Sequence, residues 1–155
     1  MRIYLVRHGV AKSKEQDPQR RLTDRGAHDA QKIAAFLEPL HLNVKAIWHS
    51  GKPRAAQTAE ILVEAVSTED GMIERSGMAP NDPVLPMIKS AIGAGGDVVL
   101  VGHLPFLGKF ASALVTRNDD ADLIAFEPAT VVCLEDDTAN NWRIAWTITP
   151  DILQG

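Results

Sequence analysis

Short, mostly apolar runs stand out along the chain at residues 3–6, 44–48 and 97–101. Continuous runs of this length are typical of strands that are buried on both faces, as in a parallel sheet. A weaker run at residues 72–74 predicts one more short strand. The three main runs are each followed closely by polar residues. The pattern therefore predicts a buried sheet whose strands finish at polar segments.

Segments with helical periodicity separate these strands. Three longer helices are predicted, over residues 24–38, 53–66 and 105–115. Thr23 or Asp24 caps the first of them, and Pro53 suits the first position of the second. A shorter helix is predicted over residues 83–92, with Asp82 as its cap.

The last part of the chain has a different pattern. Residues 130–134 and 142–148 are predicted strands, joined as a hairpin by a turn-rich stretch. Trp142 and Trp146 are four residues apart on one strand and are expected to face the same way. Together the elements predict a single α/β domain over residues 1–155. We expect a three-layer sandwich with a mostly parallel central sheet, helices on both faces and a C-terminal antiparallel hairpin.

Charge and cysteine content narrow the class of protein. The 16 Lys and Arg residues against 20 Asp and Glu give a net charge of −4, which speaks against a general nucleic-acid binder. The one cysteine, Cys133, excludes an internal disulfide and a multi-cysteine metal site, and predicts a reducing compartment. No apolar run approaches the roughly 18 residues of a membrane span, and the first run is too short for a secretory signal. We therefore expect a cytoplasmic protein that binds neither nucleic acid nor membrane.

Basic side chains gather at the predicted strand ends, where ligands bind in α/β sheets. Arg7 and His8 follow the first strand, His49 and Arg54 follow the second, and His103 follows the third main strand. A guanidinium group matches phosphate oxygens in a bidentate way, and a neutral imidazole can attack phosphorus. The three histidines could also be metal ligands, but the neighbouring arginines would repel a cation. The residues therefore predict a phosphoryl site with no metal and no cofactor.

Four segments, in this order, resemble the histidine phosphatase superfamily, also called the phosphoglycerate mutase-like fold. They are residues 7–9 (RHG), 20–26 (RRLTDRG), 50–59 (SGKPRAAQTA) and 102–105 (GHLP). The small size of the chain and residues 79–83 (APNDP) most resemble the SixA branch, the phosphohistidine phosphatases. The resemblance spans about residues 2 to 115.

The sequence departs from the family pattern at two positions. Gly51 stands where the family usually has Pro, and His49 stands where it often has Ser. Neither departure removes a charged group from the motif. These departures therefore affect the expected shape of the loop at residues 49–52 more than its chemistry.

The resemblance implies a role for each matching residue. His8 is the nucleophile that accepts the phosphoryl group, and His103 stabilises the transition state. Arg7 and Arg54 complete the catalytic pocket around the phosphoryl oxygens. Further groups are expected to bind the substrate phosphate: Arg20, Ser50 and, as second choice to Arg20, Arg21.

The general acid is left open. Larger members of the superfamily place a glutamate in the stretch that here offers Glu74 and Asp82, and the cap before Pro83 explains Asp82 equally well. An imidazole leaving group, with a reference pKa of ~6.5, departs more readily than an alkoxide. A phosphohistidine substrate therefore needs less help from an acid than a phosphate monoester does.

The resemblance implies a metal-independent phosphatase that acts on phosphohistidine in a protein partner, either a phosphotransfer domain or a histidine kinase domain. Residues 67–96 offer little lid, which favours a macromolecular substrate and speaks against a mutase. Two alternatives stay open. One is a phosphatase of small phosphate esters, and the other is a non-catalytic module that binds phosphate or a phosphoprotein.

Overall fold

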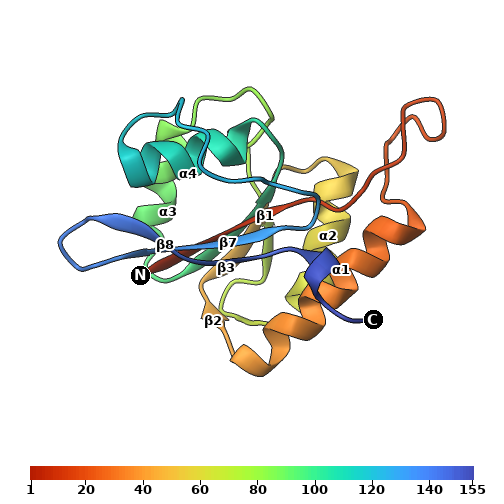
Figure 1. Cartoon of the computed structure of the whole chain (residues 1–155), viewed down its shortest axis with the longest axis horizontal. Coiled ribbons are helices and arrows are strands. Elements are labelled where there is room, and N and C mark those ends of the chain that lie inside the picture. Colours follow the sequence, from red (N-terminus) through yellow and green to blue (C-terminus); the bar gives the residue numbers. More distant parts are fainter.

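A six-stranded sheet runs through the middle of the molecule, which is described by a computed structural model covering residues 1–155 (Figure 1). The strands lie in the order β5 (Met72–Glu74), β3 (Ala46–His49), β6 (Val98–Gly102), β1 (Arg2–Arg7), β7 (Val131–Asp136) and β8 (Trp142–Ile148). The first four are parallel, β7 is antiparallel to β1, and β8 is antiparallel to β7. Two further short strands, β2 (Asn43–Val44) and β4 (Ser67–Thr68), pair with each other. The predicted parallel sheet with a C-terminal antiparallel hairpin is confirmed.

Helices cover both faces of this sheet (Figure 1). The first pair, on one face, is α1 (Asp24–Leu37) and α2 (Pro53–Val63), and the second pair, on the opposite face, is α3 (Leu85–Ile92) and α4 (Phe106–Thr116). Two single-turn 3₁₀ helices, η1 (Glu38–Leu40) and η2 (Pro150–Ile152), follow α1 and β8. None of the helices has both the length and the apolar character needed to cross a membrane.

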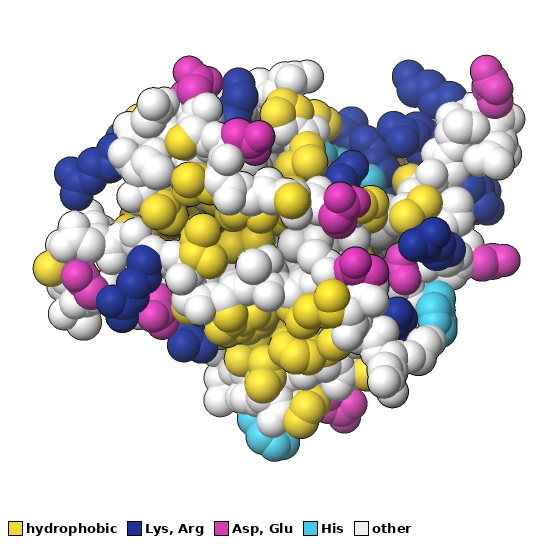
Figure 2. All heavy atoms as spheres, in the orientation of Figure 1, with side chains coloured by type: hydrophobic (Ala, Val, Ile, Leu, Met, Phe, Trp, Pro, Cys, Tyr) yellow, Lys and Arg dark blue, Asp and Glu magenta, His cyan; other side chains and the backbone are white.

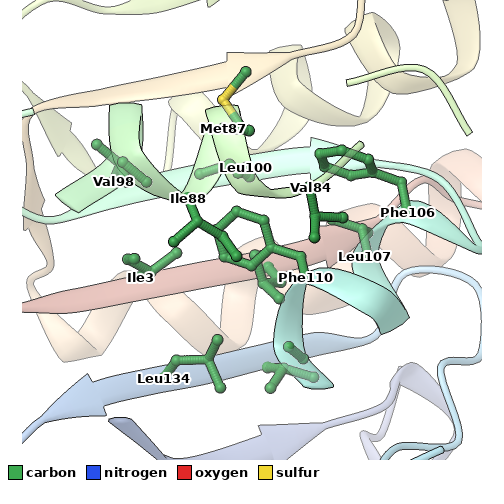
Figure 3. Packing of buried hydrophobic residues seen from close by; sticks show 14 of the residues in the cluster. Ile3, Val84, Met87, Ile88, Val98, Leu100, Phe106, Leu107, Phe110 and Leu134 are labelled. Carbon is green, nitrogen blue, oxygen red and sulfur yellow. The ribbon is translucent and has the colours of Figure 1, made fainter. Parts of the chain in front are cut away.

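Continuous apolar strands are required because the sheet is buried on both sides. On β1, Ile3 and Leu5 belong to the core under α3 and α4, whereas Tyr4 and Val6 belong to the core under α1 and α2. Figure 3 shows the first of these cores, where side chains of α4 such as Phe110 pack over the sheet. Since both cores consist of buried hydrophobic residues, the polar ends of the strands are the places where the sheet meets solvent and ligands.

Two helix boundaries differ from the prediction. Helix α2 ends at Val63, three residues before the predicted end. Helix α3 begins at Leu85 with Pro86 in its first turn, so Asp82 and Pro83 do not open it. Asp82 instead accepts a hydrogen bond from the Ala79 N–H at 2.8 Å and closes a turn. In contrast, Thr23 caps α1 as predicted.

The prediction that Trp142 and Trp146 face the same way is wrong. The register of β7 and β8 shifts between Cys133 and Leu134, so one extra residue enters β8 between the two tryptophans. A bulge of this kind reverses the alternation of side chains. Trp142 therefore packs into the core under α4, whereas Trp146 packs against Tyr4 on the opposite face, with ring centroids 6.1 Å apart.

Candidate active site

Three neighbouring strands, β3, β6 and β1, end at the same edge of the sheet. Arg7 lies opposite Gly102, and His49 lies opposite Val101. The His8 N–H continues the ladder by donating to the Gly102 carbonyl oxygen at 3.0 Å. The segments 7–9, 49–54 and 102–105, which are far apart in the sequence, are thereby held side by side.

Two imidazole rings face each other at this edge. The ring centroids of His8 and His103 are 5.0 Å apart. His8 Nδ1 lies 2.7 Å from the carbonyl oxygen of Gly9, and a carbonyl can only accept, so Nδ1 carries the proton. The Nε2 atom of a neutral His8 therefore keeps its lone pair. His103 is only 2% exposed, and its Nε2 lies 2.6 Å from the Ser50 hydroxyl.

Both imidazoles are neutral at neutral pH. Burial, followed by the charges of Arg54, Arg7 and Arg20, lowers the pKa of His8 to about 4, against the raising effect of the Gly9 carbonyl. Burial and the neighbouring positive groups lower the pKa of His103 to about 3. An uncharged His8 ring with a free Nε2 lone pair is the form required of a nucleophile.

Two arginines beside these rings lack anionic partners. Arg7 donates from Nη1 to the carbonyl oxygen of Phe126 at 2.7 Å, and neither Arg7 nor Arg54 forms a salt bridge. The Nε atoms of both are buried without a hydrogen-bond partner. Burial lowers the pKa of both guanidinium groups. Because buried polar groups are normally paired, this arrangement is suited to an anion that supplies the missing acceptors.

The structure separates the two adjacent arginines of the N-terminal loop. Arg20 has a left-handed backbone (φ 51°), donates from Nε to the Lys12 carbonyl oxygen at 3.1 Å, and its charge lowers the pKa of both His8 and His103. Arg21 pairs with Asp17 at 2.9 Å, and its side chain is 55% exposed. Arg20 therefore lies with Arg7 and Arg54 in a basic cluster beside the two histidines. Arg21 instead stabilises the loop through its salt bridge with Asp17.

Thr58, on α2, was not singled out from the sequence, although it lies in the segment that resembles the family. Its Oγ1 accepts a hydrogen bond from the Gly9 N–H at 3.1 Å and donates to the Arg54 carbonyl oxygen at 2.8 Å. Thr58 is fully buried. It ties the loop that carries His8 to the first turn that carries Arg54, and so fixes the nucleophile relative to the guanidinium group.

The two departures from the family pattern are explained by one hydrogen bond. The buried His49 accepts a hydrogen bond at Nδ1 from the Gly51 N–H at 3.0 Å. Gly51 has φ 86°, and a β-carbon there would lie 2.7 Å from the Glu74 carboxyl carbon. Proline has no N–H and cannot adopt this φ, so His49 at one position and Gly51 at the other belong together. In this loop the Ser50 hydroxyl lies 2.6 Å from His103 Nε2.

Neither of the candidate acids, Glu74 and Asp82, is among the groups that most affect the pKa of His8 or His103. The groups whose charges shift the pKa of His8 and His103 are all basic side chains or the other imidazole. Glu74 lies against Gly51, and Asp82 closes the turn at Ala79. No group of three or more His, Cys, Asp or Glu side chains is arranged to hold a metal ion.

Known proteins resemble this chain in sequence. The sequence model of the histidine phosphatase superfamily (branch 1) matches residues 3–79. An uncharacterised protein of Picosynechococcus sp. (strain ATCC 27264 / PCC 7002 / PR-6) is 32% identical over 121 residues, which cover 74% of this chain and 73% of that protein.

Solved structures share the fold over nearly the whole chain. The protein histidine phosphatase SixA in complex with tungstate superposes with a TM-score of 0.84 at 20% identity, over 99% of this chain and 100% of that one. A phosphoserine phosphatase variant from Entamoeba histolytica, in complex with phosphoserine, gives a TM-score of 0.70 at 12% identity, over 99% of each chain. The predicted phosphoglycerate mutase-like fold is confirmed.

Proposed function

The chain belongs to the histidine phosphatase superfamily (branch 1), and on that premise we propose that it hydrolyses phosphohistidine on a protein partner through a covalent phospho-His8 intermediate. The observation that carries the proposal is the state of His8. Its Nδ1 proton is held by the Gly9 carbonyl, and burial among arginines keeps the ring neutral. The Nε2 lone pair is thus available for attack beside a cluster of unpaired cations.

In the first step, Nε2 of His8 attacks the phosphorus of the substrate in line with the bond to the leaving imidazole nitrogen. The P–N bond to the substrate histidine breaks as the P–Nε2 bond forms. The guanidinium groups of Arg7, Arg54 and Arg20 bind the equatorial oxygens, where charge is spread in the transition state. His103, whose Nε2 lies 2.6 Å from the Ser50 hydroxyl, stabilises the same transition state. The departing nitrogen takes the P–N electron pair, and the substrate ring leaves as neutral imidazole because its other ring nitrogen already carries a proton, whereas an alkoxide must gain a proton as it leaves.

In the second step, water attacks the phosphorus of phospho-His8 and the P–Nε2 bond breaks. Inorganic phosphate leaves, and neutral His8 is restored. The Gly9 carbonyl holds Nδ1–H throughout both steps, so the ring returns to the tautomer that can attack again. The cycle needs no group that the chain does not supply.

The short connection between α2 and α3 supports a macromolecular substrate. Residues 64–84 contain only the short strands β4 and β5 and no helix. A cavity of about 620 Å³ opens beside the basic cluster, lined by polar and proline residues. A histidine projecting from a phosphotransfer or histidine kinase domain would reach such a site without the opening of a lid.

A phosphatase of small phosphate esters is the second candidate. The specific observation in its favour is the shared fold of the Entamoeba histolytica phosphoserine phosphatase in complex with phosphoserine. The opposing observation is that no carboxylate is among the groups that most affect the pKa of His8 and His103, since an alkoxide leaving group needs a proton donor. A non-catalytic binding module is the third candidate, and the neutral, oriented His8 speaks against it.

A comparison of substrates tests the proposal. We expect kcat/KM for a phosphohistidine peptide to exceed that for phosphoserine and phosphotyrosine peptides of the same sequence. A preference for the monoesters would overturn the phosphohistidine assignment. Labelled substrate should leave an acid-labile, base-stable phosphoryl group on the wild-type chain and none on His8→Ala, with His28→Ala, an exposed position, as the matched control. A chain that binds phosphate but forms no adduct would be a binding module.

A further inference from the structure

The cavity beside the catalytic groups is lined by basic side chains and by no acidic one. Of its eight lining residues, four are basic, namely Lys14, Arg20, Lys52 and Arg54. The others are Gln19 and three prolines. We call this cavity of about 620 Å³ the basic groove. Arg20 and Arg54 are shared with the phosphoryl site, the charge of Lys52 also lowers the pKa of His103, and Lys14 extends beyond the site.

The cations of the basic groove have no carboxylate partners. None of its four basic side chains forms a salt bridge. Elsewhere on the molecule, Arg2 and Arg143 share Glu135, and Lys45 lies between Glu69 and Asp70. Figure 2 shows Lys and Arg side chains gathered with a histidine where the N-terminal loop meets the body of the molecule. The cations of the basic groove are thus not neutralised by ion pairs, unlike these other basic side chains.

The N-terminal loop (residues 10–22) carries two carboxylates, the exposed Glu15 beside Lys14 and Asp17, and Asp17 is bound within the loop itself. Asp17, whose side chain is only 7% exposed, pairs with Arg21 and accepts hydrogen bonds from the N–H groups of Gln19 and Arg21. The loop is also bridged at Ala11 and Leu22. These contacts fix the chain on either side of Arg20 and pair Asp17 with Arg21. Asp17 therefore does not pair with a cation of the groove, and Glu15 forms no salt bridge with one.

A single phosphoryl group does not account for four cations in the groove in addition to Arg7. In the proposed mechanism Arg7, Arg54, Arg20 and His103 already bind the oxygens of one phosphoryl group, which leaves Lys14 and Lys52 for other groups of the substrate. Positive clefts of this kind select and steer partners of opposite charge. The prolines and Gln19 offer no apolar pocket for an aliphatic or aromatic anchor.

We infer that the basic groove binds acidic side chains of the partner protein that flank its phosphohistidine, with Lys14 and Lys52 as specificity residues. The inference rests on the proposed function and adds the character of the substrate surface. A partner histidine surrounded by Asp and Glu is bound in the groove while its phosphoryl group enters the pocket. A partner whose histidine is surrounded by Lys and Arg is repelled.

The test uses three phosphohistidine peptides that differ only in their flanks, which carry Glu, Gln or Lys. We expect kcat/KM to be highest for the Glu peptide, about threefold to tenfold above the Gln peptide at low salt, and this ratio to shrink as salt screens the charges. Lys14→Ala and Lys52→Ala should each reduce the Glu-to-Gln ratio by about threefold. Lys89→Ala removes the same charge from an exposed position on α3 and should leave the ratio as it is.

Several outcomes separate the inference from the proposed function. Equal rates on the Glu and Gln peptides, or a preference that survives in the double variant Lys14→Ala/Lys52→Ala, would overturn the inference and leave the phosphohistidine activity standing. A faster rate on a sugar bisphosphate than on the matching monophosphate, with no effect of peptide charge, would overturn the inference too. Binding of the unphosphorylated Glu and Gln peptides, followed by fluorescence anisotropy, gives the same comparison without turnover. There, tighter binding of the Glu peptide that is lost in the double variant supports the inference, and equal binding overturns it.

Discussion

The backbones of Gly9 and Gly26 lie against each other at the site. A β-carbon on Gly9 would stand 2.7 Å from the Gly26 carbonyl oxygen, and a β-carbon on Gly26 would stand 2.1 Å from the Val10 carbonyl oxygen. The RHG and RRLTDRG segments thus meet through their glycines. The N-terminus of α1 can approach the loop that carries His8 only because neither position has a side chain.

Gly26→Ala should destabilise the chain even though alanine is normally the better helix residue. Gly26 lies in the first turn of α1, and its missing side chain faces the Val10 backbone, which cannot move away cheaply. We expect a loss of about 1–3 kcal/mol in the free energy of unfolding, together with lower activity as the His8 loop shifts. Gly108→Ala is the control, because a β-carbon there meets nothing within 4 Å inside α4. Gly108→Ala should raise the free energy of unfolding by about 0.5–1 kcal/mol. Urea unfolding measures both, and a neutral Gly26→Ala would show that the contact is not tight.

Much of the fold could be predicted from the sequence because its main signals are local. The buried strands are continuous apolar runs, and the first helix carries its own cap at Thr23. The placement of His8 and His103 at one edge also required only the rule that parallel strands end together. Local signals failed where two segments offered the same chemistry. Pro83 and Pro86 both suit a first helical turn, and only the packing of the turn at Ala79 decides between them.

Other features depend on contacts that no short pattern marks. The bulge that turns Trp146 away from Trp142 is a property of strand pairing, not of either strand alone. The carbonyl oxygen of Phe126, which holds Arg7, is a backbone group from a distant loop. The resemblance already placed Arg20 ahead of Arg21, but the hydrogen bond from Arg20 Nε to the Lys12 carbonyl oxygen depends on where the loop folds back. Such long-range backbone contacts are formed by the tertiary fold, so sequence alone could not supply them.

The His49–Gly51 hydrogen bond makes these two residues thermodynamically coupled. Gly51→Pro should cost about 3 kcal/mol or more, since proline removes the N–H and cannot adopt φ 86°. His49→Ser should cost about 1–3 kcal/mol, because a buried ring and an acceptor are lost. The loss in the free energy of unfolding of the double variant should be about 1 kcal/mol smaller than the sum of the two single losses, because both substitutions remove the same hydrogen bond. The losses from His49→Ser and Gly95→Pro should be additive when unfolding is measured in urea, because Gly95 is a left-handed glycine where a β-carbon would meet nothing within 4 Å.

Removal of the two candidate acids tests whether the leaving group needs a proton donor. Glu74→Gln and Asp82→Asn keep the size of each side chain, and Asn can still accept the Ala79 N–H. We expect the rate on a phosphohistidine peptide to change by less than about threefold in either variant, because an imidazole leaves without strong acid help. A loss of a hundredfold or more in one variant would identify that carboxyl group as the general acid. Thermal unfolding of both variants controls for damage to the fold.

Stability should fall as the pH drops below the ordinary pKa of histidine. Burial and the nearby guanidinium charges lower the pKa of His8 to about 4 and that of His103 to about 3 in the folded chain, against ~6.5 when unfolded. Between about pH 4 and 6.5 the unfolded chain therefore binds more protons, so the free energy of unfolding decreases as the pH is lowered through this window. Each of the two histidines contributes up to about 1.4 kcal/mol per pH unit to this decrease in the free energy of unfolding. His103→Asn should remove the contribution of His103.

NMR of ¹³C-labelled histidine rings gives the direct readout for the same two groups, with His8→Asn and His103→Asn variants to assign the signals. The His8 signal should still report a neutral ring at pH 5. Added inorganic phosphate should raise the pKa of both rings, because its negative charge offsets those of Arg7, Arg20 and Arg54. Titration of His8 near 6.5 in the phosphate-free chain would contradict the assignment, since a nucleophile shielded by neither burial nor guanidinium charge would be largely protonated at pH 5.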